Sequence, residues 1–188
     1  GTITASLGGA SDDGKFVTVI KSESGSDWQE INIIEIETGN ELEDELKWVK
    51  FSGTSWVNDG FYYSRYPKPE GSAFSSENVF HSVYYHKLGT PQSEDELIYR
   101  DEDEPNRYHF AYATEDNKYL ILNVSTGTDG NSLLVKDIAQ KDSQWEVLVD
   151  GFKDHSSVVE HIDGKILLLT DIDAPKYRLV AADASADL

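Results

Sequence analysis

The sequence predicts an all-β fold in which four-stranded antiparallel sheets recur along the chain. Four times in 188 residues, Asp followed by Gly or Asn precedes a run of β-branched and aromatic residues. The pairs are Asp13-Gly14, Asp59-Gly60, Asp116-Asn117 and Asp163-Gly164. Such pairs mark hairpins because a tight hairpin turn needs residues that accept positive φ. Their spacing of 46, 57 and 47 residues, counted on the second residue of each pair, is typical of propeller blades. We therefore expect a partial β-propeller of about four blades, belonging to a larger protein.

The first repeat supplies four strands in which alternating residues give each strand a buried face. Turns are marked by Gly25-Ser26 and Thr38-Gly39. The acidic run Glu41–Glu45 is expected between strands, where its charges are solvated, and Glu41–Trp48 is the one segment where a helical turn is tolerated. The expected strands are Leu7–Ala10, Phe16–Lys21, Glu30–Ile36 and Lys47–Phe51.

The other repeats follow the same plan. The second is long because a surface loop rich in Pro, Gly and Ser, Pro67–Asn78, intervenes between two strands. Its expected strands are Thr54–Val57, Phe61–Tyr66, His81–Lys87 and Leu97–Arg100. Those of the third are His109–Thr114, Tyr119–Val124, Ser132–Ile138 and Trp145–Val149. The fourth offers only Ser156–His161, Lys165–Thr170 and Tyr177–Ala182, so we expect its outer strand to be missing. With no linker evident, residues 1–188 should form a single propeller fragment with blades over about 7–51, 54–100, 109–149 and 156–182.

Composition excludes several classes of partner. The formal net charge of −19 would repel phosphate backbones, so nucleic acid is not expected as a partner. No stretch approaches the roughly 18 apolar residues of a membrane span, so we expect a soluble protein without membrane contact. The chain has no Cys, which excludes disulfides and thiolate sites and leaves a cytoplasmic or periplasmic location open. It also has no Met, which suggests that it begins inside a longer reading frame or after processing.

Nucleophilic catalysis is not expected of this chain. A serine hydrolase of the α/β type presents its nucleophile on a Gly-x-Ser-x-Gly turn, near a His base and an oxyanion hole. Ser26 and Ser72 each follow a glycine, but both lack the second glycine and lie in predicted hairpin loops. The histidines are scattered and are interpreted as strand or loop residues: His81, His86, His109, His155 and His161.

Neither a metal nor another cofactor is expected. Asp101, Asp103 and Glu104 carry oxygen ligands that suit calcium, but the glycine and terminal Glu of an EF-hand loop are missing. The segment Thr128–Asn131 is interpreted as a hairpin turn.

Several short motifs, in order along nearly the whole chain, carry a resemblance to a known family. They are Ser24-Gly25-Ser26-Asp27-Trp28, Val49-Lys50-Phe51-Ser52, Val83–Thr90 with Gln92–Asp95 after it, Asp103-Glu104-Pro105 and Tyr177-Arg178-Leu179. The chain thereby resembles the propeller of the prolyl oligopeptidases. The resemblance implies a middle portion of a seven-bladed propeller, inserted ahead of an α/β-hydrolase domain in a serine endopeptidase that cleaves short peptides after proline. The partners it implies are that hydrolase domain and short peptides.

The resemblance also implies substrate-pocket residues. Phe51 would help line the pocket for the substrate residue two before the proline, where an aromatic ring gives a broad, rigid contact. Tyr108 matches a pocket position at which many members have Met. Thr128 matches a position that is often Cys. Asp27 matches a carboxylate near the amino-terminal end of the bound peptide. The alternatives are ordinary blade core for Phe51, a strand-start aromatic for Tyr108 and a turn-capping residue for Asp27.

Two functions of different classes follow. In one, the chain is a non-catalytic part of the peptidase that walls the substrate cavity and excludes folded proteins. In the other, it is an autonomous propeller-like binding module, since a fold alone does not fix a function. The length of the source reading frame would separate them, because only the first requires a downstream hydrolase domain. Open blade edges further predict self-association of the chain.

Overall fold

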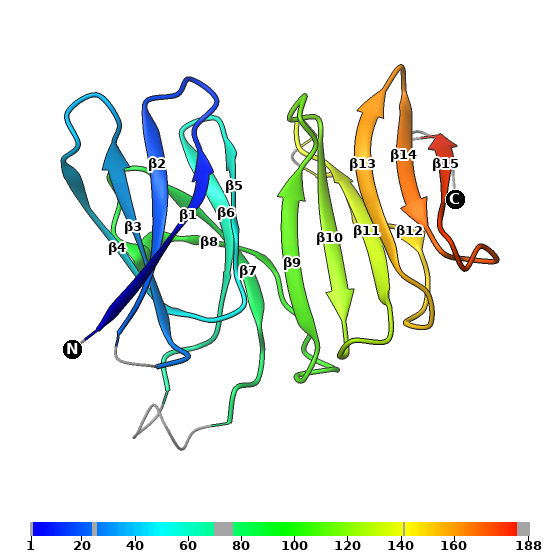
Figure 1. Ribbon diagram of the computed structural model, residues 1–188, viewed down its shortest axis with the longest axis horizontal. Coiled ribbons are helices and arrows are strands. Elements are labelled where there is room, and N and C mark those ends of the chain that lie inside the picture. The colour runs from blue at the N-terminus through cyan, green and yellow to red at the C-terminus, as the bar shows by residue number, and fades with distance from the viewer. Residues whose placement is uncertain (1, 24–25, 70–76, 141, 184–188) are drawn as a thin grey trace. The chain divides into compact units, whose positions relative to one another are not determined.

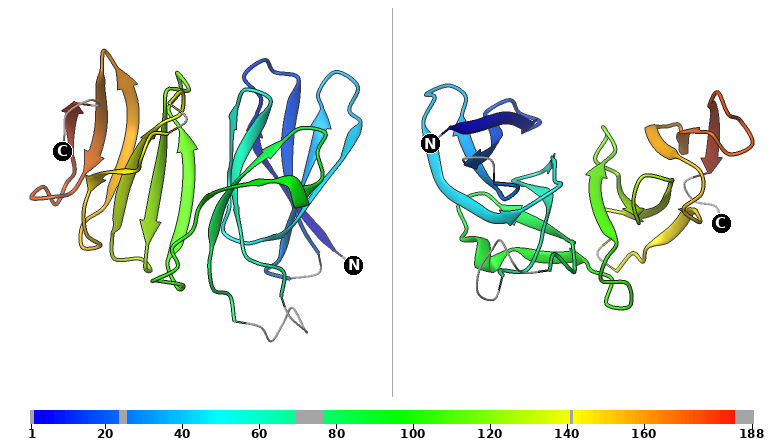
Figure 2. Two further views of the ribbon diagram at one scale, coloured as in Figure 1. Left: turned by 180° about the vertical axis from the view of Figure 1, so that it is seen from behind. Right: turned by 60° about the horizontal axis from the view of Figure 1, so that its bottom comes forward.

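The computed structural model describes residues 2–23, 26–69, 77–140 and 142–183, and these residues form an all-β structure (Figure 1). Their fifteen strands make four antiparallel sheets, each with its strands in chain order (Figure 2). This confirms the predicted fold class. Of the residues described, none forms a helix long and apolar enough to cross a lipid bilayer.

The sheets contain four, four, four and three described strands. The first has β1 (Ile3–Ala10), β2 (Phe16–Glu23), β3 (Gln29–Glu35) and β4 (Glu41–Val49). The second has β5 (Thr54–Val57), β6 (Gly60–Arg65), β7 (Ser82–Lys87), the short 3-10 turn η1 (Gln92–Glu94) and β8 (Glu96–Tyr99). The third has β9 (Tyr108–Ala113), β10 (Tyr119–Ser125), β11 (Asn131–Asp137) and β12 (Glu146–Val149). The fourth has β13 (Ser156–Ile162), β14 (Lys165–Thr170) and β15 (Arg178–Asp183).

The chain divides into two compact units, an N-terminal unit of residues 1–106 and a C-terminal unit of residues 107–188. The first two sheets belong to the N-terminal unit and the last two to the C-terminal unit. No linker between units was expected from the sequence. That residues 1–188 form one propeller fragment stays a prediction.

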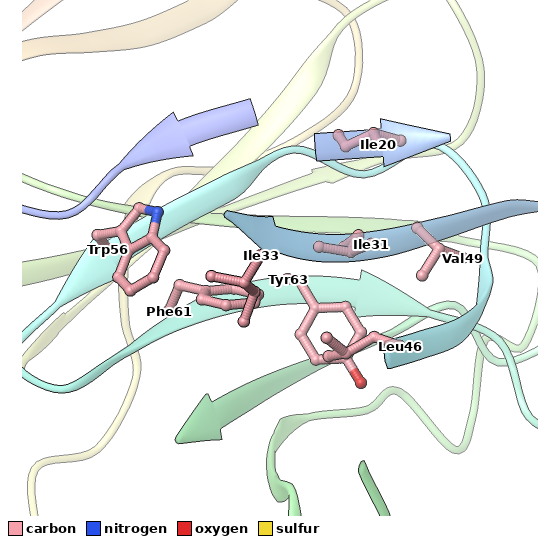
Figure 3. Packing of buried hydrophobic residues seen from close by; sticks show 8 residues of the cluster. All are labelled: Ile20, Ile31, Ile33, Leu46, Val49, Trp56, Phe61 and Tyr63. Atoms are coloured by element: carbon pink, nitrogen blue, oxygen red, sulfur yellow. The ribbon is translucent and has the colours of Figure 1, made fainter. Parts of the chain in front are cut away.

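Side chains that alternate along the strands form the core of the N-terminal unit. Ile31 and Ile33 project from β3, and Phe61 and Tyr63 project from β6, each at most 1% exposed. Figure 3 shows these four with the rest of the cluster, which comprises Ile20, Leu46, Val49 and Trp56. Burial of one large apolar side chain contributes about 1.5–3 kcal/mol, so this core is the main stabilising element of the two sheets.

The same period of two builds the core of the C-terminal unit. Buried residues two apart on β10, β11 and β14 meet in one cluster: Tyr119, Ile121, Leu133, Val135, Ile166 and Leu168. The alternation that predicted the strands is thus the alternation that buries them.

Three of the four predicted turns have the expected left-handed residues. Gly14 has a φ of 68°, Asn117 of 56° and Gly164 of 77°. The prediction was wrong at Asp59-Gly60, because Val57 pairs with Gly60 and the turn therefore consists of Asn58 and Asp59. Asn58 supplies the positive φ there, at 56°.

Gly60 instead permits close packing at the start of β6. A Cβ at this position would overlap the carbonyl oxygen of His86 and lie 2.8 Å from the Tyr85 hydroxyl. A glycine in a strand often marks such a close approach.

Two further expectations were wrong, namely solvated charges between strands for Glu41–Glu45 and a tolerated helical turn for Glu41–Trp48, because both segments lie entirely within strand β4. Its glutamates are exposed on one face, whereas Asp44 and Leu46 are buried on the other. The period of two was concealed by an inward-facing aspartate. Gly25 of the predicted turn Gly25-Ser26 lies outside the described residues. Residues 70–76 of the predicted loop Pro67–Asn78, which include Ser72, also lie outside them.

Candidate functional site

The four residues selected from the sequence fall in two units. Asp27 and Phe51 belong to the N-terminal unit, and Tyr108 and Thr128 belong to the C-terminal unit. Each pair is therefore described within its own unit.

Asp27 and Phe51 lie in loops whose neighbouring residues are in contact. The loop of Asp27 precedes β3, and the loop of Phe51 follows β4, its partner strand. The Lys50 ammonium lies 4.4 Å from the centre of the Trp28 ring, which is a cation–π contact. Asp27 itself is exposed. The structure thus brings together the residues adjacent to Asp27 and Phe51.

Trp28 is the centre of an aromatic cluster beside these loops. The Trp48 ring meets it edge-on, with centroids 5.8 Å apart, and the Tyr66 ring does so at 6.2 Å. Tyr66 also lies 4.9 Å from the imidazole of His81. Edge-to-face pairs contribute about 0.5–1.5 kcal/mol each beyond area burial, so the cluster fixes the position of Trp28.

Among the described residues of this unit, three aromatic ones have left-handed backbone conformations. Their φ angles are 62° at Trp48, 50° at Phe51 and 62° at Phe80. Bulky residues rarely adopt positive φ, which costs about 1–3 kcal/mol and persists only where the surroundings enforce it. Such strain is concentrated at functional sites, which makes the loop of Phe51 a candidate on physical grounds.

Contacts on both sides of Phe51 hold this backbone. Nε2 of the buried His81 donates to the Lys50 carbonyl oxygen at 2.9 Å. The Ser64 amide donates to Ser52 Oγ at 2.8 Å. Phe51 lies between these anchors with 56% of its surface exposed and does not belong to the buried core cluster.

A cavity of about 260 Å³ lies beside the aromatic cluster. Trp28 and Tyr66 form part of its wall, together with Pro67, Lys68, Pro69, Glu77, Asn78 and Val79. Asp27 and Phe51 are not among these lining residues.

In the C-terminal unit, Tyr108 and Thr128 lie at the same end of neighbouring strands. Tyr108 begins β9, is partly buried and pairs with Ser125 at the end of β10. Thr128 is exposed in the turn that follows β10. Its carbonyl oxygen accepts a hydrogen bond from His155 Nε2 at 3.2 Å.

A buried network around His86 was not predicted. Nδ1 of His86 donates to Asp95 at 2.7 Å and Nε2 donates to Asp44 at 3.0 Å, and all three side chains are at most 6% exposed. The Tyr63 hydroxyl donates to the second oxygen of Asp95 at 2.6 Å. No sequence signal could have found this network, because Asp44 lies in an acidic run that resembles a solvated loop.

The two carboxylates favour the cationic form of His86. Burial alone lowers the pKa of this imidazole, but hydrogen bonds and charges from Asp95 and Asp44 outweigh it and raise the pKa above its ordinary value. Because both ring nitrogens are engaged, neither is available as a general base. The network is therefore suited to joining the first sheet to the second.

The segments considered for calcium form turns. Asp101 Oδ1 accepts the amide N–H groups of Asp103 at 3.1 Å and Glu104 at 3.0 Å, as a turn-capping aspartate does. Within the described ranges, no three His, Asp or Glu side chains are grouped so that they could hold a metal ion.

Comparison with known proteins identifies relatives along nearly the whole chain. The profile of the prolyl oligopeptidase N-terminal β-propeller domain matches residues 4–187. The prolyl endopeptidase of Elizabethkingia meningoseptica is 44% identical over 169 residues, which cover 89% of this chain and 24% of the relative. Prolyl oligopeptidase A of Amanita bisporigera is 32% identical, over 97% of this chain and 27% of the relative. The chain thus spans about a quarter of the length of these curated relatives.

Solved structures agree with these matches. Prolyl oligopeptidase B from Galerina marginata, bound to a 25mer macrocyclization substrate, superposes with a TM-score of 0.88 at 28% identity, over 97% of this chain and 28% of that one. A structure from an analysis of two prolyl endopeptidases gives a TM-score of 0.87 at 31% identity, over 97% and 27% of the two chains.

Proposed function

Because this chain belongs to the prolyl oligopeptidase family, as part of its N-terminal β-propeller domain, we propose that it walls the substrate cavity of a serine endopeptidase that cleaves short peptides after proline. In this proposal the chain is non-catalytic. It contacts the peptide and excludes folded proteins, and a hydrolase domain elsewhere in the protein supplies the nucleophile.

The exposed ring of Phe51 is the observation that carries the proposal. Phe51 is 56% exposed on a strained backbone, although an aromatic residue of this size is ordinarily buried. A strained, exposed and well-anchored aromatic residue suits a binding contact, because little conformational entropy is lost when a ligand meets it. Phe51 would meet the apolar substrate residue two before the proline.

Asp27, Tyr108 and Thr128 are proposed as further contacts. The exposed Asp27 carboxylate suits a cationic peptide terminus. Tyr108 and Thr128, in the C-terminal unit, would offer a bound peptide more hydrogen-bonding groups than the Met and Cys of many family members.

Kinetics of the full-length protein that contains this sequence would test the proposal. Two fluorogenic peptides should be compared, one with a large apolar residue and one with glycine two positions before the proline. Phe51→Ala should raise KM for the first peptide about tenfold, leave kcat unchanged and have little effect on the second. Ile36→Ala, which truncates another exposed apolar side chain of this unit, is the control. An equal loss for both peptides would contradict a pocket role for Phe51.

The length of the source reading frame tests the parent protein. The proposal requires a downstream hydrolase domain with a serine nucleophile, whereas an autonomous propeller-like binding module would have none. Self-association of the isolated chain stays a prediction, which sedimentation at two ionic strengths would check. Because the net charge is −19, association should strengthen as salt screens the repulsion.

A further inference from the structure

His81 contacts the main chain that carries Phe51, and we propose that it is a positioning residue for peptide recognition. This inference rests on the proposed function, since it assigns His81 an effect that acts through Phe51. The imidazole would hold the loop in the one conformation that presents the aromatic ring.

The geometry of His81 suits this role. Its side chain is fully buried, immediately before β7, and its Nε2 lies 2.9 Å from the Lys50 carbonyl oxygen. Since a carbonyl oxygen can only accept, Nε2 must carry a proton. The Tyr66 ring, 4.9 Å away, packs against the imidazole. The donor is therefore held in place by packing as well as by its bond.

Further contacts anchor Lys50 and Ser52, the residues on either side of Phe51. Lys50 is 8% exposed and its ammonium group lies against the Trp28 ring, so both its main chain and its side chain are anchored. On the far side of Phe51, Ser52 Oγ accepts the Ser64 amide and donates to the Gly53 carbonyl oxygen at 2.7 Å. Phe51 is thus the one residue of the segment 50–52 whose side chain is largely exposed while its neighbours are anchored.

Loss of the His81 donor should release this arrangement. The Lys50 carbonyl oxygen would lose a buried hydrogen bond, and the peptide bond to Phe51 could rotate towards an ordinary negative φ. The direction of the Phe51 ring would change with that rotation. The effect on catalysis should therefore appear in KM, and only for peptides that contact this ring.

A double-mutant cycle in the full-length protein tests the inference. His81→Phe and His81→Leu both remove the donor, so one can replace the other if it does not fold, whereas His81→Gln retains an N–H donor. Each is combined with Phe51→Ala and measured with the apolar and the glycine peptide. Tyr85→Phe is the matched control. It also removes a side-chain donor to a carbonyl oxygen, because the hydroxyl of Tyr85, on β7, donates to the Val57 carbonyl oxygen.

The donor-less variants should raise KM for the apolar peptide about threefold to tenfold, the range that corresponds to one lost hydrogen bond, without lowering kcat. In the Phe51→Ala background the same substitutions should have no further effect, and His81→Gln should restore part of the loss. The inference is wrong if the two losses multiply, if both peptides lose equally or if Tyr85→Phe behaves like the donor-less variants. If Phe51→Ala itself does not discriminate between the peptides, the proposed function fails, and the inference about His81 fails with it.

Discussion

Nδ1 of His86 lies 2.7 Å from Oδ1 of Asp95, and neither side chain is more than 1% exposed. With Asp44 on the other ring nitrogen, the imidazole joins β4 of the first sheet to β7 and to the residue that precedes β8. Removal of one partner of a buried charged pair leaves an uncompensated charge, which typically costs about 3–5 kcal/mol. Two anionic side chains in this core therefore depend on a single cation.

Substitution of His86 should show this dependence as a function of pH. The pKa of His86 is raised, so its contribution to stability is complete below the unfolded value of about 6.5 and is lost as pH rises through the folded pKa. The difference in Tm between the wild-type protein and His86→Gln should be largest near about pH 6 and smaller near about pH 9. Thermal unfolding across that range is the measurement, and a difference that grows with pH would contradict the assignment.

Asp116 should give the opposite pH dependence in the C-terminal unit. Burial is the largest single effect on Asp116 and raises its pKa, but the hydrogen bonds from Thr114, His161 and the Lys118 amide together outweigh it and lower the pKa to about 2. A carboxylate whose pKa is lower in the folded state stabilises the fold at pH values above its unfolded-state pKa. That stabilisation is lost as the pH falls through the folded-state pKa. The destabilisation caused by Asp116→Asn should therefore be full at neutral pH and shrink from about pH 4 to about pH 2. Acid titration of the two unfolding curves would check this.

The hydroxyls of Ser11 and Thr114 should contribute equally to the stability of the turns in which they lie. Each donates to the aspartate two residues later, at 2.8 and 2.6 Å, and accepts an amide from the strand after the turn, at 2.9 and 3.1 Å. Ser11→Ala and Thr114→Ala should each destabilise the protein by about 1 kcal/mol. Ser11→Thr and Thr114→Ser keep the hydroxyl and are the controls. Denaturant unfolding would show whether these turns need the hydroxyl.

Gly60→Ala should destabilise the protein by about 1–3 kcal/mol, because the new methyl group would overlap the His86 carbonyl oxygen. The control is Gly53→Ala, where a Cβ would have no neighbour within 4 Å. That substitution should be neutral or slightly stabilising, since alanine restricts the unfolded chain. Equal losses in the two variants would show that Gly60 is not needed for close packing.

The strands could be predicted from the sequence because the same alternation that marks them also buries them, as at Ile31 and Ile33 on β3. Residues 41–46 of strand β4 could not, because the buried Asp44 breaks the apolar pattern and is compensated by His86, which is 42 residues away in sequence. The turn before β6 was misplaced by one residue, since Gly60 is required there by packing rather than by φ.

The candidate site was predictable only in part. The resemblance to the prolyl oligopeptidases pointed to Asp27 and Phe51, but no short-range pattern connects Phe51 to His81. His81 reaches the Lys50 carbonyl oxygen across 31 residues of sequence. Contacts between a side chain and a distant main-chain atom leave no periodic signal, so only the structure reveals them.

The backbone of Phe51 also has a consequence for selection. At a φ of 50°, glycine or asparagine would fit with less strain than phenylalanine. Variants chosen for thermal resistance alone should therefore replace Phe51 readily, whereas variants chosen for turnover of peptides that contact the ring should retain it. Applying both selections to one library would separate residues retained for stability from residues retained for activity. Position 51 should be substituted under the first selection and remain Phe under the second.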